Sequence, residues 1–187
     1  MSTIKLFLCL LCITYLSSNE LHRRDLLIRI LKHTRQKPSR FTIIEIANNE
    51  LEVRELTGRN DGPRVEAYLS AVQLKKGDPW CAAFVSWVYK QAGFPRPRTG
   101  WSPALFPIFR LARSALPGDV IGIYFPQLKR IAHVGIVTQQ RGKWIYSIEG
   151  NTTEQGNREG QGVFKKVRHI STIRSIANWY TERGQGQ

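Results

Sequence analysis

Hydrophobic residues follow two periods along the chain, a helical period first and a strand period later. The helical period predicts helices over 41–51 and 64–74, and from Asp78 to about Ala92. The later pattern of β-branched and aromatic residues predicts strands near 120–124, 131–139, 143–149 and 162–168. A final helix is predicted over 172–181. Helices followed by an antiparallel sheet make an α+β domain.

A long connection, residues 93–116, separates the two halves. It contains four prolines together with Trp101 and several apolar residues. Such a segment is typical of a packed connection without regular structure of its own, and it is a candidate for one wall of a cleft.

The N-terminus carries an apolar run over 6–16 behind Lys5, which predicts a signal peptide over 1–18. As a helix this run spans about 16 Å, too short for a hydrocarbon core of about 30 Å. We therefore expect no transmembrane domain and a secreted, periplasmic or cell-envelope protein. Tyr15 or Leu16 occupies a position where cleavage prefers a small residue, so an uncleaved membrane anchor is the alternative. Residues 19–40 form a basic linker or helix before a domain over 41–187.

Cys81 is the one cysteine of the predicted mature chain, because Cys9 and Cys12 lie in the leader. A lone cysteine in an exported protein is a buried residue without a chemical role, an intermolecular link or a nucleophile.

The residues around Cys81 predict a helix start. Asp78 suits the N-cap, Pro79 the first helical position, and Gly93 the residue after the end. Cys81 then lies in the first turn, where backbone N–H groups and the helix dipole stabilise a thiolate and can receive an oxyanion. The alternative is a core cysteine that begins a buried helix.

A predicted hairpin supplies a base and a carboxylate. The three-residue loop Gln140-Arg141-Gly142, with Gly142 at positive φ, places His133 directly opposite Glu149 on one face, with Cβ atoms roughly 4.5–5.5 Å apart. A two-residue Arg141-Gly142 turn would move Glu149 to the other face. In the first register a nucleophile, a base and an orienting acid are all present.

Four strings in order resemble the CHAP domain (cysteine, histidine-dependent amidohydrolase/peptidase), a papain-like group related to NlpC-type wall peptidases. They are Pro79-Trp80-Cys81-Ala82-Ala83-Phe84-Val85-Ser86-Trp87, Pro117-Gly118-Asp119-Val120, Ala132-His133-Val134-Gly135-Ile136-Val137 and Glu149-Gly150-Asn151. The resemblance covers roughly residues 41–180. It implies a single papain-like domain in which Cys81 is the nucleophile, His133 the base, Glu149 the orienting residue and Asn151 an auxiliary polar residue.

Other polar residues receive simpler interpretations. A zinc site from Cys81, His133 and Glu149 is the metal alternative, but no paired Cys-x-x-Cys or His-x-x-x-His spacing supports it. We expect neither metal nor cofactor. The remaining histidines and two loop residues are read as non-catalytic, with Asn60 a loop cap and Asp119 a turn residue; the histidines are His22, His33 and His169.

The formal net charge is +14, and residues 79–148 hold nine Lys or Arg against one acid, Asp119. This balance suits an anionic polymer such as peptidoglycan, whose peptides carry carboxylates, or the phosphate-rich polymers of some walls. Nucleic acid is the other polyanion, but the basic residues form no tight cluster interleaved with aromatic residues, and export separates the protein from it.

Together these features predict a secreted, monomeric cysteine peptidase or amidase that cleaves amide bonds in bacterial peptidoglycan. Whether it cuts the N-acetylmuramoyl-L-alanine bond or a peptide bond stays open. One alternative is the same thiol site acting on a non-wall peptide or in acyl transfer. The other is a non-catalytic, basic wall- or polyanion-binding protein in which Cys81 is structural.

Overall fold

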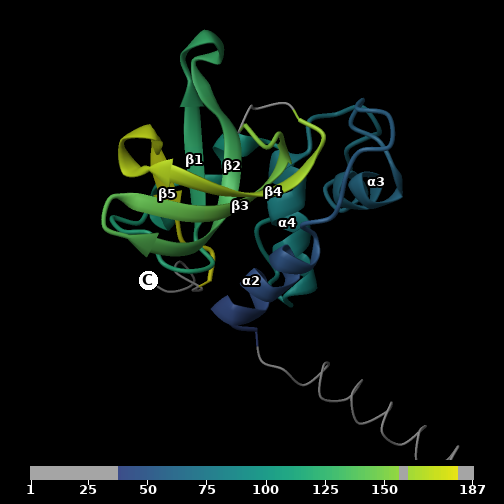
Figure 1. Cartoon of the computed structure of the whole chain (residues 1–187). Coiled ribbons are helices and arrows are strands. Elements are labelled where there is room, and N and C mark those ends of the chain that lie inside the picture. The colour runs from purple at the N-terminus through teal and green to yellow at the C-terminus, as the bar shows by residue number, and fades with distance from the viewer. Residues whose placement is uncertain (1–37, 156–159, 181–187) are drawn as a thin grey trace, which may run out of the picture. The chain divides into compact units, whose positions relative to one another are not determined.

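Helices occupy the first half of the described chain and strands the second half (Figure 1). The computed structural model describes residues 38–155 and 160–180. These ranges contain three α-helices and one five-stranded antiparallel sheet, so the α+β prediction is confirmed. The predicted signal peptide over 1–18 and most of the basic segment over 19–40 lie outside the described residues.

The three helices are α2 (Arg40–Asn49), α3 (Pro63–Ser70) and α4 (Cys81–Gln91). The Oγ of Ser39 caps α2 by accepting the backbone N–H of Thr42 at 3.0 Å. At the other end of the helical half, Gly93 follows α4 with φ +84°, as the sequence predicts for the residue after a helix end. None of the helices in the described ranges has the length and apolar character needed to cross a membrane.

The sheet has the strand order β4-β3-β2-β1-β5. Its strands are β1 (Val120–Phe125), β2 (Arg130–Arg141), β3 (Trp144–Thr152), β4 (Gly162–His169) and β5 (Ser175–Ala177). The first four lie where the residue pattern predicts them.

The predicted final helix over 172–181 is wrong. A 3₁₀ turn, Ile170–Thr172, leads instead into β5. The backbone of β5 pairs with β1 and forms the edge of the sheet, and its residue Ile176 enters an apolar cluster with Ile121, Val137 and Ile145. This pairing satisfies backbone groups of β5 that a helix would satisfy internally, and it covers the side of β1 that faces away from β2.

The core is centred on α4, whose first nine residues are all buried. A helix that is buried all round has to be covered by other elements on every side. On one side it packs against a cluster that includes Val134, Ile136 and Ile148 of β2 and β3. Gly150 lets β3 approach closely, because a Cβ there would lie 2.7 Å from Trp80 and 2.8 Å from Phe84.

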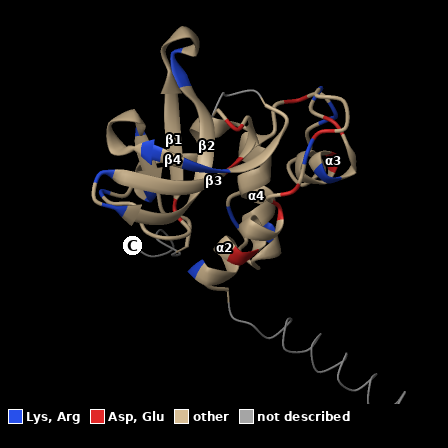
Figure 2. Ribbon diagram, viewed as in Figure 1, with Lys and Arg blue, Asp and Glu red and all other residues tan. Residues whose placement is uncertain are grey.

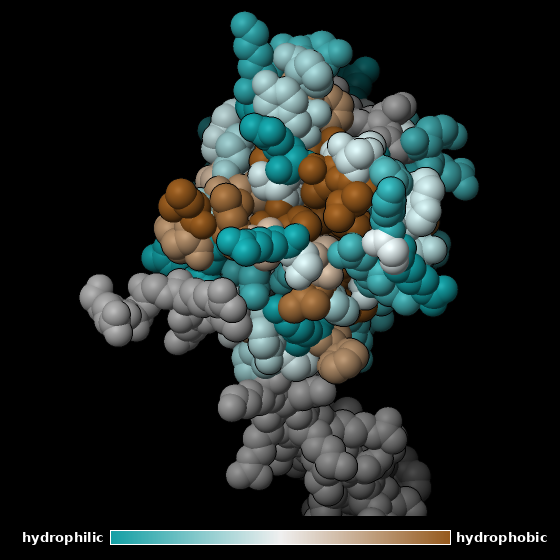
Figure 3. Space-filling view, turned by 90° about the vertical axis from the view of Figure 1, so that its left-hand side faces the viewer, coloured by the Kyte–Doolittle hydropathy of each residue, from teal (hydrophilic) through white to brown (hydrophobic). Residues whose placement is uncertain are grey.

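The connection over 93–116 is packed, as predicted. It contains two 3₁₀ turns, η1 (Ser102–Leu105) and η2 (Ile108–Arg110). Leu105 is buried, and its carbonyl accepts the indole N–H of Trp179 at 2.9 Å. Some large apolar side chains remain at the surface, among them Ile108, which is 86% exposed. Figure 3 shows one face on which apolar side chains emerge among hydrophilic ones.

Charge divides unevenly along the described chain (Figure 2). Lys and Arg mark the hairpin ends and β4 of the sheet, whereas most acidic residues lie in the helical half before Cys81. Asp119, predicted as a turn residue, does accept the N–H of Leu116 at 2.9 Å. It is also buried and forms an ion pair with Arg40 at 2.8 Å, which joins the start of α2 to the turn before β1.

We expect Gly150→Ala to lower the free energy of unfolding by about 1–3 kcal/mol, because the new methyl group overpacks the contact with Trp80 and Phe84. Urea unfolding measures the loss. Gly142→Asn is the control, since Gly142 has φ +56° with open space around it and Asn tolerates this conformation. Equal stability of the Gly150→Ala variant and the wild type would contradict the close approach.

Candidate active site

Cys81 is the first residue of α4, and Trp80 is the residue that caps it. The prediction of a first-turn cysteine is confirmed, but the predicted cap is wrong. Asp78 instead accepts the N–H of Lys75 at 2.8 Å in the preceding turn, so Asp78 and Pro79 both lie before the helix. The Cys81 side chain is therefore two positions closer to the N-terminal end of the helix, with its unpaired N–H groups, than a start at Pro79 would give.

Two groups from distant parts of the chain lie next to the thiol. Ser102 Oγ is 3.5 Å from Cys81 Sγ, and the carbonyl oxygen of Ala132 is 3.9 Å away. Ser102 comes from η1, within the connection proposed as a wall of a cleft, but the sequence alone does not single it out. Cys81 is 5% exposed, so the thiol lies just beneath the surface.

His133 and Glu149 form a buried pair. His133 Nε2 lies 2.9 Å from Glu149 Oε2, and both side chains are completely buried. Sequence spacing thus correctly placed the imidazole and the carboxylate on the same face. The register that brings them together differs from the predicted one.

The β2–β3 hairpin closes with Arg141 opposite Trp144, so the turn residues are Gly142 and Lys143. Both predicted loops, the three-residue Gln140-Arg141-Gly142 and the two-residue Arg141-Gly142, are therefore wrong. With this turn alone, the side chains of Glu149 and His133 would lie on different faces of the sheet. A bulge between Val137 and Gln139 shifts the pairing by one residue and restores the shared face.

Beyond the bulge Ile136 pairs with Ile148, so Glu149 comes opposite Gly135, and His133 is its diagonal neighbour. A Cβ on Gly135 would lie 2.5 Å from Cγ of Glu149. The absence of a side chain at Gly135 therefore gives the Glu149 side chain room to reach His133.

Arg168 and Ser147 complete the surroundings of Glu149, and sequence analysis missed both. Arg168 donates two hydrogen bonds to the carboxylate, Nε to Oε1 at 2.9 Å and an Nη to Oε2 at 2.5 Å. Ser147 Oγ donates to Oε1 at 2.8 Å. The available signal was the carboxylate itself, because a buried charge needs a cation and hydrogen-bond donors.

These contacts set the charge of the site. Burial raises the pKa of Glu149, but the hydrogen bonds of Arg168 and His133 outweigh it and lower the pKa to about 2. Burial acts the other way on His133, yet hydrogen bonding to Cys81 and Glu149 raises its pKa to about 9. Glu149 is therefore an anion at neutral pH, and the imidazole favours its charged form.

The thiol is coupled to the imidazole. Burial would raise the pKa of Cys81, but the hydrogen bond and charge of His133, helped by Ser102 and the backbone of Ala82, bring the pKa below its ordinary value. Nε2 of His133 faces Glu149, so Nδ1 is the ring nitrogen that interacts with the thiol. Nδ1 is buried and has no partner of ordinary hydrogen-bond geometry among the described residues. Such contacts commonly tighten when substrate binds.

Asn151 lies at the end of β3 with φ +55° and is buried. With its amide oriented to satisfy its neighbours, Oδ1 accepts the N–H of Trp80 at 3.0 Å, and the nitrogen donates to Gly160 O at 3.0 Å and Asn60 Oδ1 at 3.3 Å. These contacts reach the helix start rather than the imidazole. Asn60 also donates to the Gly77 carbonyl, consistent with its expected role in loop structure.

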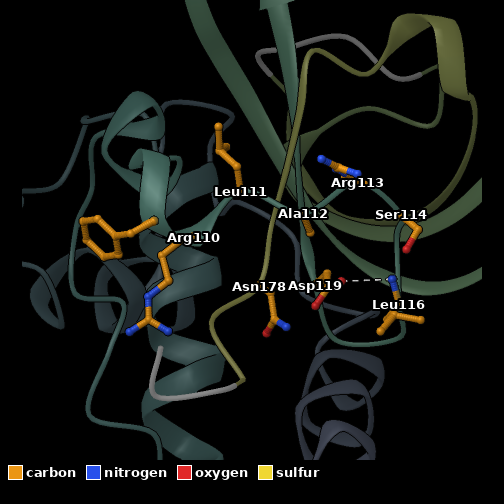
Figure 4. Close-up of a pocket in the computed structure, with 9 residues that line it drawn as sticks. Arg110, Leu111, Ala112, Arg113, Ser114, Leu116, Asp119 and Asn178 are labelled. Carbon is orange, nitrogen blue, oxygen red and sulfur yellow. Dashed lines mark hydrogen bonds between the residues drawn. The ribbon is translucent and has the colours of Figure 1, made fainter. Parts of the chain in front are cut away.

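Two hollows in the described part of the surface lie away from the thiol. One of about 340 Å³ is lined by Arg110, Asp119 and Asn178 among others (Figure 4), and a second lies along residues 95–99. Neither is lined by Cys81 or His133. The chemistry therefore identifies the candidate site, since neither hollow contains a nucleophile next to a base. Within the described residues no three or more His, Cys, Asp or Glu side chains are grouped to hold a metal ion.

Comparison with solved structures supports the fold. A crystal structure of an NlpC/P60 family protein from Bacillus cereus superposes with a TM-score of 0.50 at 14% sequence identity. The match covers 78% of this chain and 42% of that one, so this chain corresponds to less than half of its structural neighbour. Searches against protein-family models and curated proteins find no match. At this identity the likeness shows the fold alone, and the predicted papain-like architecture is confirmed.

Arg168→Gln tests how the charge of Glu149 is maintained. Without the two hydrogen bonds and charge of Arg168, the pKa of Glu149 should rise above its value of about 2. Once Glu149 is protonated it no longer stabilises a charged His133. As the pH falls, Cys81 of the variant should therefore lose its reactivity toward iodoacetamide at a higher pH than Cys81 of the wild type. Rate constants for alkylation, measured from acid to neutral pH, report the shift.

Arg174→Gln is the matched control, since Arg174 is an exposed arginine with its guanidinium 6.0 Å from the Tyr124 ring. Arg168→Lys keeps the positive charge but loses the two parallel N–H donors of the guanidinium, so its pH profile of alkylation should lie between those of Arg168→Gln and the wild type. Superimposable profiles for Arg168→Gln and the wild type would show that Arg168 does not govern the carboxylate.

Proposed function

We propose that the protein is an exported, CHAP-type cysteine peptidase or amidase that cleaves amide bonds in bacterial peptidoglycan. The observation that carries the proposal is the His133–Glu149 pair, 2.9 Å apart and buried, coupled to a thiol at a helix start. A structural cysteine does not require a polarised imidazole beside it. The proposal includes secretion through the signal peptide over 1–18, or retention by that segment as a membrane anchor.

The reaction begins with transfer of the Cys81 proton to His133, which gives a thiolate and an imidazolium. Glu149, held by Arg168, fixes the ring and offsets its charge. The sulfur attacks the amide carbonyl, and backbone N–H groups at the start of α4 receive the developing oxyanion.

Protonated His133 then gives its proton to the departing amine and leaves an acyl-enzyme on Cys81. Water, deprotonated by His133, hydrolyses the thioester and restores the thiol. Ser102, with its hydroxyl 3.5 Å from Sγ, stabilises the thiolate by a hydrogen bond. No step needs a metal or an organic cofactor.

Two observations favour a wall polymer as substrate. The fold matches an NlpC/P60 family protein, and the described catalytic half is basic, which suits the carboxylates of peptidoglycan and phosphate-rich wall polymers. The same thiol site acting on another peptide or in acyl transfer is the second candidate. A basic, non-catalytic wall-binding protein is the third, and nucleic acid remains disfavoured as a partner.

Incubation of purified peptidoglycan with the protein should release soluble peptides or new free amines. Cys81→Ala should abolish release but still pellet with the insoluble wall at low salt, because binding through surface charge does not use the thiol. Mass spectrometry of the soluble fraction identifies the bond that is cut. Release that survives in Cys81→Ala, or new reducing sugar ends, would refute the amidase proposal.

Glu149→Gln should lower turnover by roughly 10²–10⁴, by analogy with the orienting acid of serine triads. Asn151→Ala should cost less turnover, because Asn151 contacts the helix start and cannot balance an imidazolium. Steady-state kinetics on released amines compare the two, and circular dichroism checks that each variant folds. A larger loss for Asn151→Ala would assign the orienting role to Asn151 instead.

A further inference from the structure

Arg130 and Trp101 form a cation–aromatic pair close to the thiol. The guanidinium carbon of Arg130 lies 4.2 Å from the centre of the Trp101 ring, and Trp101 is 53% exposed. Arg130 begins β2 and directly follows Lys129, and Figure 2 shows blue just below the uncharged tip of the β1–β2 hairpin.

The chain fixes this pair near the reacting sulfur from two sides. Trp101 directly precedes Ser102, whose hydroxyl is 3.5 Å from Cys81 Sγ. Arg130 precedes Ala132 by two residues, and the Ala132 carbonyl is 3.9 Å from the same sulfur. The chain neighbours of both members of the pair thus contact the same sulfur.

Within the described ranges Arg130 has no acidic partner. Its one hydrogen bond to the protein goes to the carbonyl of Ile131 at 3.1 Å, which leaves most of its N–H groups available. Two other arginines are paired with acids, since Arg168 pairs with Glu149 at the site and Arg40 pairs with Asp119 at the start of α2. Arg130 thus presents an unneutralised cation on an exposed aromatic ring.

We propose that Arg130, supported by Trp101, is a subsite that binds a free carboxylate of the substrate one or two residues from the scissile amide. A guanidinium offers two parallel N–H donors that match a carboxylate, and stacking on the indole limits its freedom before binding. The proposal rests on the proposed function and adds a requirement to it, that the peptide be acidic next to the bond that is cut.

Three synthetic peptides test this subsite. The first is the stem tetrapeptide L-Ala-γ-D-Glu-L-Lys-D-Ala, and the other two carry a carboxamide in place of the D-Glu α-carboxylate or of the terminal carboxylate. The wild type should prefer the free acid at one of these positions by about 10–100-fold in kcat/KM, the range expected for a hydrogen-bonded charge pair. Arg130→Gln should remove the preference, and Arg130→Lys should keep part of it.

Arg141→Gln is the control, because Arg141 is an exposed arginine at the opposite end of the same strand, beside Tyr146. It lowers the net charge by the same amount and should keep the full preference. The alkylation rate of Cys81 should be unchanged in Arg130→Gln, which separates substrate binding from the nucleophile.

Calorimetry measures binding of the same peptides to Cys81→Ala. It distinguishes failure of the proposed function from failure of the proposed carboxylate subsite. Preferential binding of the free acid without cleavage by the wild type overturns the proposed function and upholds the subsite. Cleavage without a carboxylate preference, or with a preference that survives Arg130→Gln, means that Arg130 merely covers Trp101. Absence of both binding and cleavage overturns the subsite as well.

Discussion

The buried carboxylate of Glu149 is the constraint around which the rest of the site is arranged. A charge removed from water is costly unless it is paired and fully hydrogen-bonded. The carboxylate of Glu149 is hydrogen-bonded by side chains from three strands, which are Ser147 on its own strand β3, His133 on β2 and Arg168 on β4. The same contacts that make its burial tolerable also keep it ionised, and an ionised partner is what lets His133 hold a proton beside a thiol.

Backbone geometry brings these groups together. The bulge near Thr138 returns Glu149 to the face of His133, and Gly135 leaves the space through which its side chain passes. At the other side of the core, Gly150 lets β3 approach the start of α4, where Asn151 accepts the N–H of Trp80. Gly150 and Asn151 thus link the strand that carries Glu149 to the helix that begins with Cys81.

Sequence reasoning predicted the helices, four of the strands and the positions of Cys81, His133 and Glu149, because these follow from periodicity and from local motifs. It obtained the shared face of His133 and Glu149 from an incorrect loop, since bulges leave little trace in a residue pattern. Arg168 and Ser102 reach the site from distant segments, so no spacing rule could find them. The helix predicted over 172–181 is wrong because this segment pairs with β1 as a strand, a long-range contact that a local residue pattern does not reveal.

The proposed mechanism requires that Cys81 form a covalent bond with the carbonyl carbon of a wall peptide. Rapid acid quenching during turnover, followed by intact-mass and peptide mass spectrometry, tests it directly. We expect an acyl adduct on Cys81, with the mass of the acyl portion of the cleaved substrate, and no adduct in Cys81→Ala or His133→Ala. Turnover without any adduct on Cys81, together with equal turnover by Cys81→Ala, would contradict it.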